Sequence, residues 1–193
     1  MVNKNSSYKF TNQERNMINE LIKYSADKGV ESSRILKGNK NITNKFEIKE
    51  DKLFCSLNPK GEKGPCEKAD CPLFNVLKRR ILFKNTTFIH SHLKNLPLSF
   101  GDVLTCLAFK MKKMIAVTLD GKFSMFIPNY NSKNFSRREL YEMESKLTKI
   151  LKQRGGVDYI FKTPNVFEKY KADVNSYWQN LAAKTGSKYI TNL

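Results

Sequence analysis

Hydrophobic positions recur at helical spacing in three stretches of the chain, and each stretch begins with a capping signal. The capping box at residues 11–14 precedes apolar residues three and four apart, so it predicts a helix from about Asn12. A second capping box, at residues 136–139, predicts a helix that ends at the next pair of glycines. The Thr-Pro pair at residues 163–164 is typical of a helix start and predicts the last helix, with the threonine as its cap.

Runs of β-branched and apolar residues predict strands elsewhere in the chain. The strands that these runs predict cover residues 30–36, 45–48, 52–57, 86–90, 113–118 and 122–127. An Asp-Gly turn joins the last two strands as a hairpin. Residues 58–72 are rich in Gly, Pro, Lys and Cys and predict a loop, whereas residues 76–83 fit a helix or a strand. Ser99 begins a further helix.

These elements predict an α+β fold in which helices flank a mixed β-sheet and two C-terminal helices follow. We expect the core to occupy residues 1–134 and a helical extension, residues 135–193, to pack on it. A length of 193 residues suits one domain of this kind.

The chain is strongly basic, with 35 Lys and Arg against 18 Asp and Glu and a formal charge of +17. This charge favours contact with nucleic acid or another polyanion. The basic residues are nevertheless spread along the chain, and only residues 78–80 form a tight cluster. Apolar runs are too short to span a membrane, and the first ten residues lack a signal-peptide pattern, so we expect a cytoplasmic protein.

The only two histidines, His90 and His92, stand two residues apart at the end of a predicted strand. Because strand side chains alternate, both imidazoles point the same way and can converge on one cation. Asp102, in the first turn of the next helix, is the natural third ligand of a zinc ion with water as the fourth. A plainer interpretation stays open: Ser99 and Asp102 form a capping box, and the histidines lie on the surface.

The pattern His90-Ser-His92, six residues, then Ser99-Phe-Gly-Asp102 resembles the motif of the JAB/JAMM zinc metallopeptidases. The six-residue gap is similar to that of prokaryotic and phage-encoded members, although Leu93 stands where such members usually carry proline. The resemblance covers residues 86–127, is faint before them and is absent after about residue 134.

This resemblance implies one zinc ion held by His90, His92 and Asp102, and hydrolysis of a peptide or isopeptide bond. It also implies that Ser99 hydrogen-bonds the oxyanion and that the protein is encoded by a phage or mobile element. The partner would be a protein or peptide substrate in the host cytoplasm, with no membrane involved. A different class of function stays open: a non-catalytic, nucleic-acid-binding or virion-associated module with the same fold.

The family also requires an upstream glutamate as general base, and the sequence offers several candidates. The order of residues around Glu20 resembles the phage-type pattern, so we expect Glu20 to be the base, although the predicted helix argues against it. Gly29-Val-Glu31 resembles the eukaryotic pattern and makes Glu31 the alternative. Glu47 and Glu50 are weaker candidates.

Three of the four cysteines, Cys55, Cys66 and Cys71, lie in or beside the loop at residues 58–72. They could bind a second, structural zinc, but their spacing matches no common pair of zinc ligands. We therefore expect reduced, unpaired thiols. Cys106 lies in the helix after Asp102, where we expect it to be a small core residue.

Overall fold

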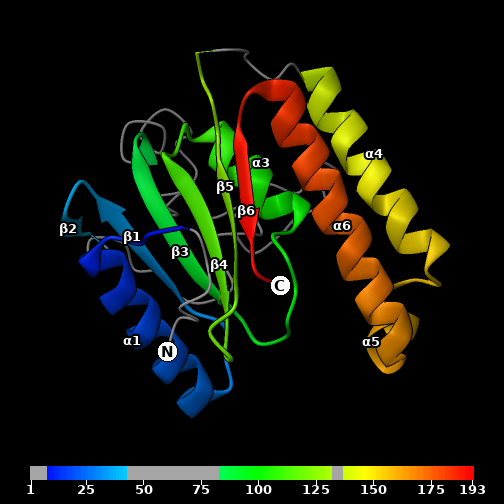
Figure 1. Cartoon of the computed structure of the whole chain (residues 1–193), viewed down its shortest axis with the longest axis horizontal. Coiled ribbons are helices and arrows are strands. Elements are labelled where there is room, and N and C mark those ends of the chain that lie inside the picture. The colour runs from blue at the N-terminus through cyan, green and yellow to red at the C-terminus, as the bar shows by residue number, and fades with distance from the viewer. Residues whose placement is uncertain (1–7, 43–82, 132–136) are drawn as a thin grey trace, which may run out of the picture.

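The computed structural model describes residues 8–42, 83–131 and 137–193, which form a six-stranded mixed sheet with helices on both faces (Figure 1). The strands, in order across the sheet, are β2 (Lys40–Asn41), β1 (Ser33–Lys37), β3 (Thr86–His92), β4 (Lys113–Thr118), β5 (Phe123–Ile127) and β6 (Lys188–Thr191). The helices in the described residues are α1 (Asn12–Lys28), α3 (Phe100–Ala108), α4 (Arg137–Gln153), α5 (Val157–Lys162) and α6 (Pro164–Thr185). The predicted α+β class is confirmed.

Strand β3 occupies the middle of the sheet and all seven of its residues are buried. It pairs antiparallel with β1 and parallel with β4, with His90 opposite Ser33 on one side and Ala116 on the other. Parallel neighbours cannot be joined by a tight hairpin, and α3 provides the crossover between them. The chain therefore passes from the end of β3 through the loop at residues 93–99 into α3, which brings the two parts of the histidine–aspartate motif together.

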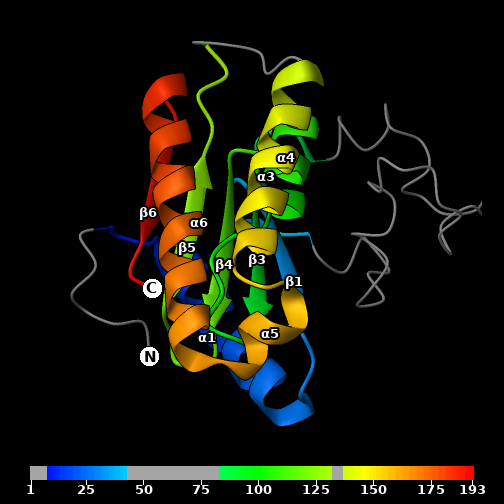
Figure 2. The same ribbon diagram turned by 90° about the vertical axis from the view of Figure 1, so that its right-hand side faces the viewer.

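The sheet separates two hydrophobic cores, with α1 on one face and α3, α4 and α6 on the other (Figure 2). Successive residues of β3 belong to opposite cores. Phe88 lies in the core that includes Trp178 of α6, whereas Ile89 lies in the core that includes Leu21 of α1. This alternation places His90 and His92 on the α3 face and Ser91 on the α1 face.

Helix α1 begins where the sequence predicts, whereas its other end, which the sequence pattern left open, is fixed by Gly29. Thr11 and Glu14 form the capping box, and Gly29 ends the helix with φ at +68°, a conformation that glycine adopts without strain. Glu14 also forms an ion pair with Lys113 of β4, and both side chains are buried. The strand predicted over residues 30–36 starts later, at Ser33, because the residues after Gly29 connect the helix to the sheet.

The C-terminal part contains two elements that the sequence did not predict. The short helix α5 lies between the two expected helices, and β6 pairs antiparallel with β5 at the edge of the sheet. Thr163 is the N-cap residue of α6 and Pro164 follows it, as predicted, although the Thr163 side chain makes no capping hydrogen bond. The segment after residue 134 thus adds a strand to the sheet as well as helices to its face.

Several predictions concern residues outside those that the structure describes. They include the strands at 45–48 and 52–57, the loop at 58–72, the element at 76–83 except Phe83, the cap residue Ser136, and the side chains of Cys55, Cys66, Cys71, Glu47 and Glu50. Cys106 is described and is fully buried, as expected. Among the described helices, none has the length and apolar composition needed to cross a membrane.

Candidate metal centre

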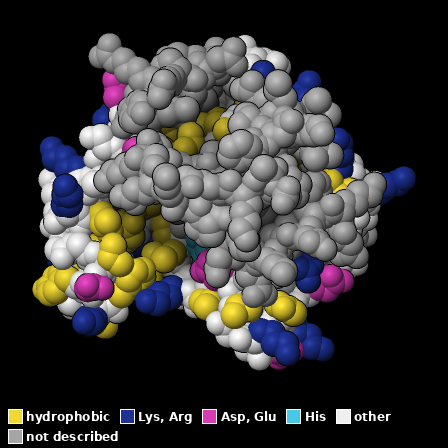
Figure 3. Space-filling view, turned by 180° about the vertical axis from the view of Figure 1, so that it is seen from behind, with side chains coloured by type: hydrophobic (Ala, Val, Ile, Leu, Met, Phe, Trp, Pro, Cys, Tyr) yellow, Lys and Arg dark blue, Asp and Glu magenta, His cyan; other side chains and the backbone are white. Residues whose placement is uncertain are grey.

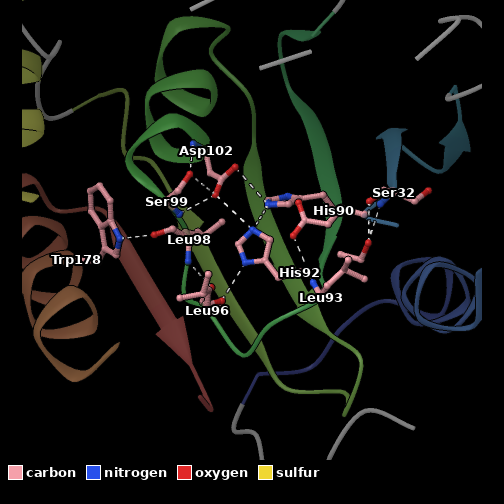
Figure 4. A network of polar contacts seen from close by, with 12 residues as sticks. Ser32, His90, His92, Leu93, Leu96, Leu98, Ser99, Asp102 and Trp178 are labelled. Carbon is pink, nitrogen blue, oxygen red and sulfur yellow. Dashed lines mark hydrogen bonds and ion pairs between the residues drawn. The ribbon is translucent and has the colours of Figure 1, made fainter. Parts of the chain in front are cut away.

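His90 and His92 point from the end of β3 toward the same place (Figure 4). Their Nε2 atoms lie 3.0 Å apart, and both side chains are buried. Two buried imidazole nitrogens at this separation can share one hydrogen or serve as two ligands of one cation. The prediction that strand alternation would bring the two rings together is confirmed.

Asp102 approaches the two histidines from the first turn of α3. Its backbone N–H donates to Ser99 Oγ, and its Oδ2 accepts hydrogen bonds from the Ser99 backbone N–H at 2.7 Å and hydroxyl at 2.8 Å. Its Oδ1 lies 3.3 Å from His90 Nε2, and its Oδ2 lies 3.8 Å from His92 Nε2. The capping box and the convergence on the histidines therefore exist together, and one carboxylate serves both.

The three side chains have the composition and spacing to hold one metal ion. One ligand atom from each lies within 4.8 Å of the other two. Tetrahedral coordination with bonds of about 2.1 Å separates neighbouring ligand atoms by roughly 3.4 Å. The separation of 3.0 Å between the two Nε2 atoms and that of 3.3 Å between His90 Nε2 and Asp102 Oδ1 lie close to this value. His92 Nε2 lies 3.8 Å from the other oxygen, Oδ2, so a small ion needs a modest shift of the carboxylate to contact all three side chains.

A backbone contact fixes the orientation of His92. Its Nδ1 lies 3.0 Å from the carbonyl oxygen of Leu96, in the loop between β3 and α3. A carbonyl oxygen only accepts, so Nδ1 carries the hydrogen and Nε2 presents its lone pair to Asp102 and His90. Such a partner on the second ring nitrogen is characteristic of metal-binding histidines.

The electrostatics of the group favour a neutral His92 beside an ionised Asp102. Burial, reinforced by the charge of His90, lowers the pKa of His92. Burial also opposes ionisation of Asp102, but the charge and hydrogen bond of His90, with His92 and Ser99, hold the pKa of Asp102 below its usual value. Metal ions bind neutral imidazole and ionised carboxylate, so these directions of the pKa of His92 and Asp102 both favour the forms that bind a metal ion.

The candidate metal ligands line a cavity of about 630 Å³ that also involves α4 and α6. Figure 3 shows a histidine deep in a hollow of this face, beside an acidic side chain, with hydrophobic side chains gathered nearby. Among the described residues that line the cavity are two carboxylates besides Asp102, namely Glu31 and Glu144. Among the described residues, the candidate ligands therefore face a cavity rather than a closed core.

The two candidates for the general base lie in different places. Glu31, just before β1, lines the cavity, and its Oε1 accepts a 3.3 Å hydrogen bond from the backbone N–H of Leu93. Glu20 is exposed on α1 and is not among the residues that line the cavity. Met17, Ile18 and Leu21 turn their side of α1 toward the sheet, which leaves Glu20 on the other side.

Sequence reasoning missed two features of the centre. The carbonyl of Leu96 is a backbone group, and no residue type signals it. Glu144 could have been found in the sequence. It stands at helical spacing from Leu147, Thr148 and Leu151, so the pattern places a carboxylate on the same face of α4 as apolar residues.

Comparison of the chain with protein-family models, with curated proteins and with solved structures finds no match. The resemblance to the JAB/JAMM metallopeptidases therefore rests on the motif residues and on their geometry. What the structure establishes is a mixed α+β fold with a buried group of His90, His92 and Asp102 that is suited to a metal ion.

Proposed function

We propose that this protein is a zinc-dependent hydrolase of peptide or isopeptide bonds, similar in its chemistry to the JAB/JAMM metallopeptidases. One observation carries the proposal: two imidazole Nε2 atoms and a carboxylate converge at a cavity whose wall holds a further carboxylate, Glu31. A hydrolase that uses a metal needs ligands for the ion and a base for water, and this arrangement supplies both.

His90, His92 and Asp102 would hold the zinc ion. Two histidine nitrogens and one carboxylate form a familiar ligand set for catalytic zinc, with a fourth position left for water or substrate. When bound, zinc supplies Lewis-acid chemistry that polarises a carbonyl group and lowers the pKa of water toward about 7. The dry surroundings of the three ligands strengthen that effect.

Glu31 would act as the general base and then as the general acid. Its carboxylate takes a proton from the attacking water as the oxygen–carbon bond forms, and it returns that proton to the amine nitrogen as the carbon–nitrogen bond breaks. The products are a carboxylic acid and an amine. The hydrogen bond from Leu93 holds one oxygen of Glu31, which leaves the other oxygen for this proton transfer.

Ser99 has two possible tasks that share a single hydroxyl hydrogen. That hydrogen points to Asp102, where it orients the carboxylate toward the histidines. The oxyanion role that the family resemblance implies requires the same hydrogen to turn to the substrate. We therefore assign Ser99 to the orientation of Asp102 in the resting protein and to the oxyanion during the reaction.

The proposal is tested by replacing the two glutamates separately and measuring both zinc content and cleavage of a casein-derived fluorogenic peptide pool. We expect Glu31→Gln to retain zinc and lose at least about a hundredfold in activity, because it removes only the base. Glu20→Gln, the matched control, should retain both. Full activity in Glu31→Gln would exclude Glu31 as the base, and an inactive but zinc-loaded wild-type chain would favour a binding module.

Binding of nucleic acid through the basic surface remains a prediction of the charge alone. The described residues that line the cavity include no lysine or arginine. Phosphate groups would therefore bind elsewhere on the protein, and such binding is compatible with the proposed hydrolase. A salt-dependent affinity for DNA or RNA that is unchanged by Glu31→Gln would identify it as a separate property.

A further inference from the structure

The cavity has a second wall that none of the proposed catalytic roles explains. On α4, four lining residues share one face at helical spacing: Glu144, Leu147, Thr148 and Leu151. Tyr170 of α6 faces the same space, and all the apolar members of this set are half-buried. Half-buried apolar side chains at the wall of a cavity offer a surface on which an apolar group of a ligand can lose its water.

The charge of the cavity is opposite to the charge of the chain. The lining residues include three carboxylates, those of Glu31, Asp102 and Glu144, and no lysine or arginine among the described ones, whereas the chain has 35 Lys and Arg. The two positive charges of a bound divalent ion would be balanced by the carboxylates of Asp102 and Glu31. The Glu144 carboxylate is then in excess, and it lies on the same stripe as Leu147 and Leu151.

We propose that the α4–α6 wall is a specificity subsite for a peptide segment in which an apolar side chain stands beside a lysine or arginine. The apolar side chain packs against Leu147, Leu151 and Tyr170, and the cationic side chain pairs with Glu144. This inference rests on the proposed function for its catalytic meaning, because it names the class of peptide that reaches the base and the metal ligands. The subsite itself consists only of protein side chains.

The positive charge of the whole protein does not oppose this assignment. At physiological ionic strength, charges farther apart than about 8 Å are largely screened, so nearby carboxylates decide the local preference. Lys94, close to the end of β3, is not among the lining residues, and its ammonium group lies 3.7 Å from the centre of the Phe161 ring on α5. That cation–π contact holds one neighbouring positive charge outside the cavity.

The test measures binding rather than cleavage. Fluorescein-labelled hexapeptides with the central pairs Leu-Lys, Lys-Leu, Leu-Glu, Glu-Leu and Ala-Lys are titrated with the full chain after chelator treatment, so that no probe is hydrolysed. We expect the better of the two Leu/Lys probes to bind about fivefold tighter than its Glu counterpart. It should also bind about tenfold tighter than the Ala-Lys probe, which cannot fill the apolar wall.

Substitutions on α4 assign the preference to the subsite. Glu144→Gln should abolish the preference for lysine over glutamate, and Glu144→Lys should reverse it, whereas Glu142→Gln changes the same charge on the same helix outside the cavity and should have no effect. Leu147→Ala should reduce the preference for leucine over alanine, with a thermal melt to verify folding.

Equal binding of the lysine and glutamate probes, or a preference that survives Glu144→Gln, would overturn the proposal, as would binding of none of the probes. Because chelated protein is used, this outcome is independent of zinc content and peptidase activity, so failure of the proposed function would be seen separately.

Discussion

The backbone N–H of Ser32 donates a 2.8 Å hydrogen bond to the hydroxyl oxygen of Ser91. The backbone N–H of Ser91 in turn donates to the Ser32 carbonyl at 2.9 Å, and its hydroxyl lies 2.7 Å from that of Ser25 on α1. Ser91 separates the two histidines in sequence but faces the opposite side of the sheet. It therefore ties the segment that carries Glu31 to the strand that carries the candidate metal ligands.

We predict that Ser91→Ala places Glu31 less accurately while leaving the metal ligands intact. The variant should retain zinc, lose about 1–3 kcal/mol in the free energy of unfolding, and show a fall in kcat larger than any rise in KM. Ser25→Ala is the control, because it removes the partner on α1 but keeps the bond between Ser32 and Ser91. Equal kcat values for the two variants would contradict a positioning role for Ser91.

Removing one partner of the ion pair between Glu14 and Lys113 should be strongly destabilising, because both side chains are buried and the other charge would stay uncompensated. Lys113 Nζ also donates a 2.8 Å hydrogen bond to the hydroxyl of Tyr8. Glu14→Ala leaves that ammonium group buried without its carboxylate. We expect the free energy of unfolding, measured in urea, to fall by about 3–5 kcal/mol. The double variant Glu14→Leu with Lys113→Met should recover most of the loss, and a loss below about 1 kcal/mol for the single variant would contradict the account.

Trp178 connects the C-terminal helix to the loop beside the metal centre. Its ring is fully buried, and its Nε1–H donates a 2.8 Å hydrogen bond to the carbonyl oxygen of Leu98, the residue before Ser99. Trp178→Phe should lower the free energy of unfolding by about 1–3 kcal/mol, because it leaves that carbonyl unsatisfied. Trp178→Ala should lower it by about 3–5 kcal/mol, because it opens a cavity. Chemical unfolding followed by circular dichroism measures both, and near-neutral effects would show that α6 is loosely attached.

Cys106 should be unreactive in the folded protein. Burial raises the pKa of its thiol, and the side chain is fully buried. An ordinary thiol, with a pKa of about 8.5, reacts faster as pH rises from 7 to 9 because its thiolate fraction grows. Peptide mapping after iodoacetamide treatment should show no such increase at Cys106 until the chain is unfolded, and labelling at pH 9 in the native state would contradict its burial.

Much of the fold followed from local sequence signals. The capping boxes at Thr11 and Ser99, together with the hairpin glycine, mark the ends of elements by interactions within a few residues. Strand β6 and helix α5 have no comparable signal. Four residues that pair with β5 are stabilised by a partner more than 60 positions away, which no local pattern encodes.

The candidate site was predictable to the extent that it follows strand geometry. Alternation along β3 was enough to bring His90 and His92 together, and the helix start was enough to bring Asp102 to them. The choice between Glu20 and Glu31 depended instead on which residues the fold places beside the end of β3, and this is a matter of sheet order. The motif pattern favoured Glu20, whereas the cavity holds Glu31.

The central claim is that His90, His92 and Asp102 bind zinc, and metal analysis of the purified chain tests it most directly. Inductively coupled plasma mass spectrometry should find about one zinc per chain in the wild type and in the Glu20→Ala control. Folded His92→Ala and Asp102→Ala variants should have lost that zinc. A folded wild-type chain without zinc, or a His92→Ala variant that keeps the full amount, would contradict the account.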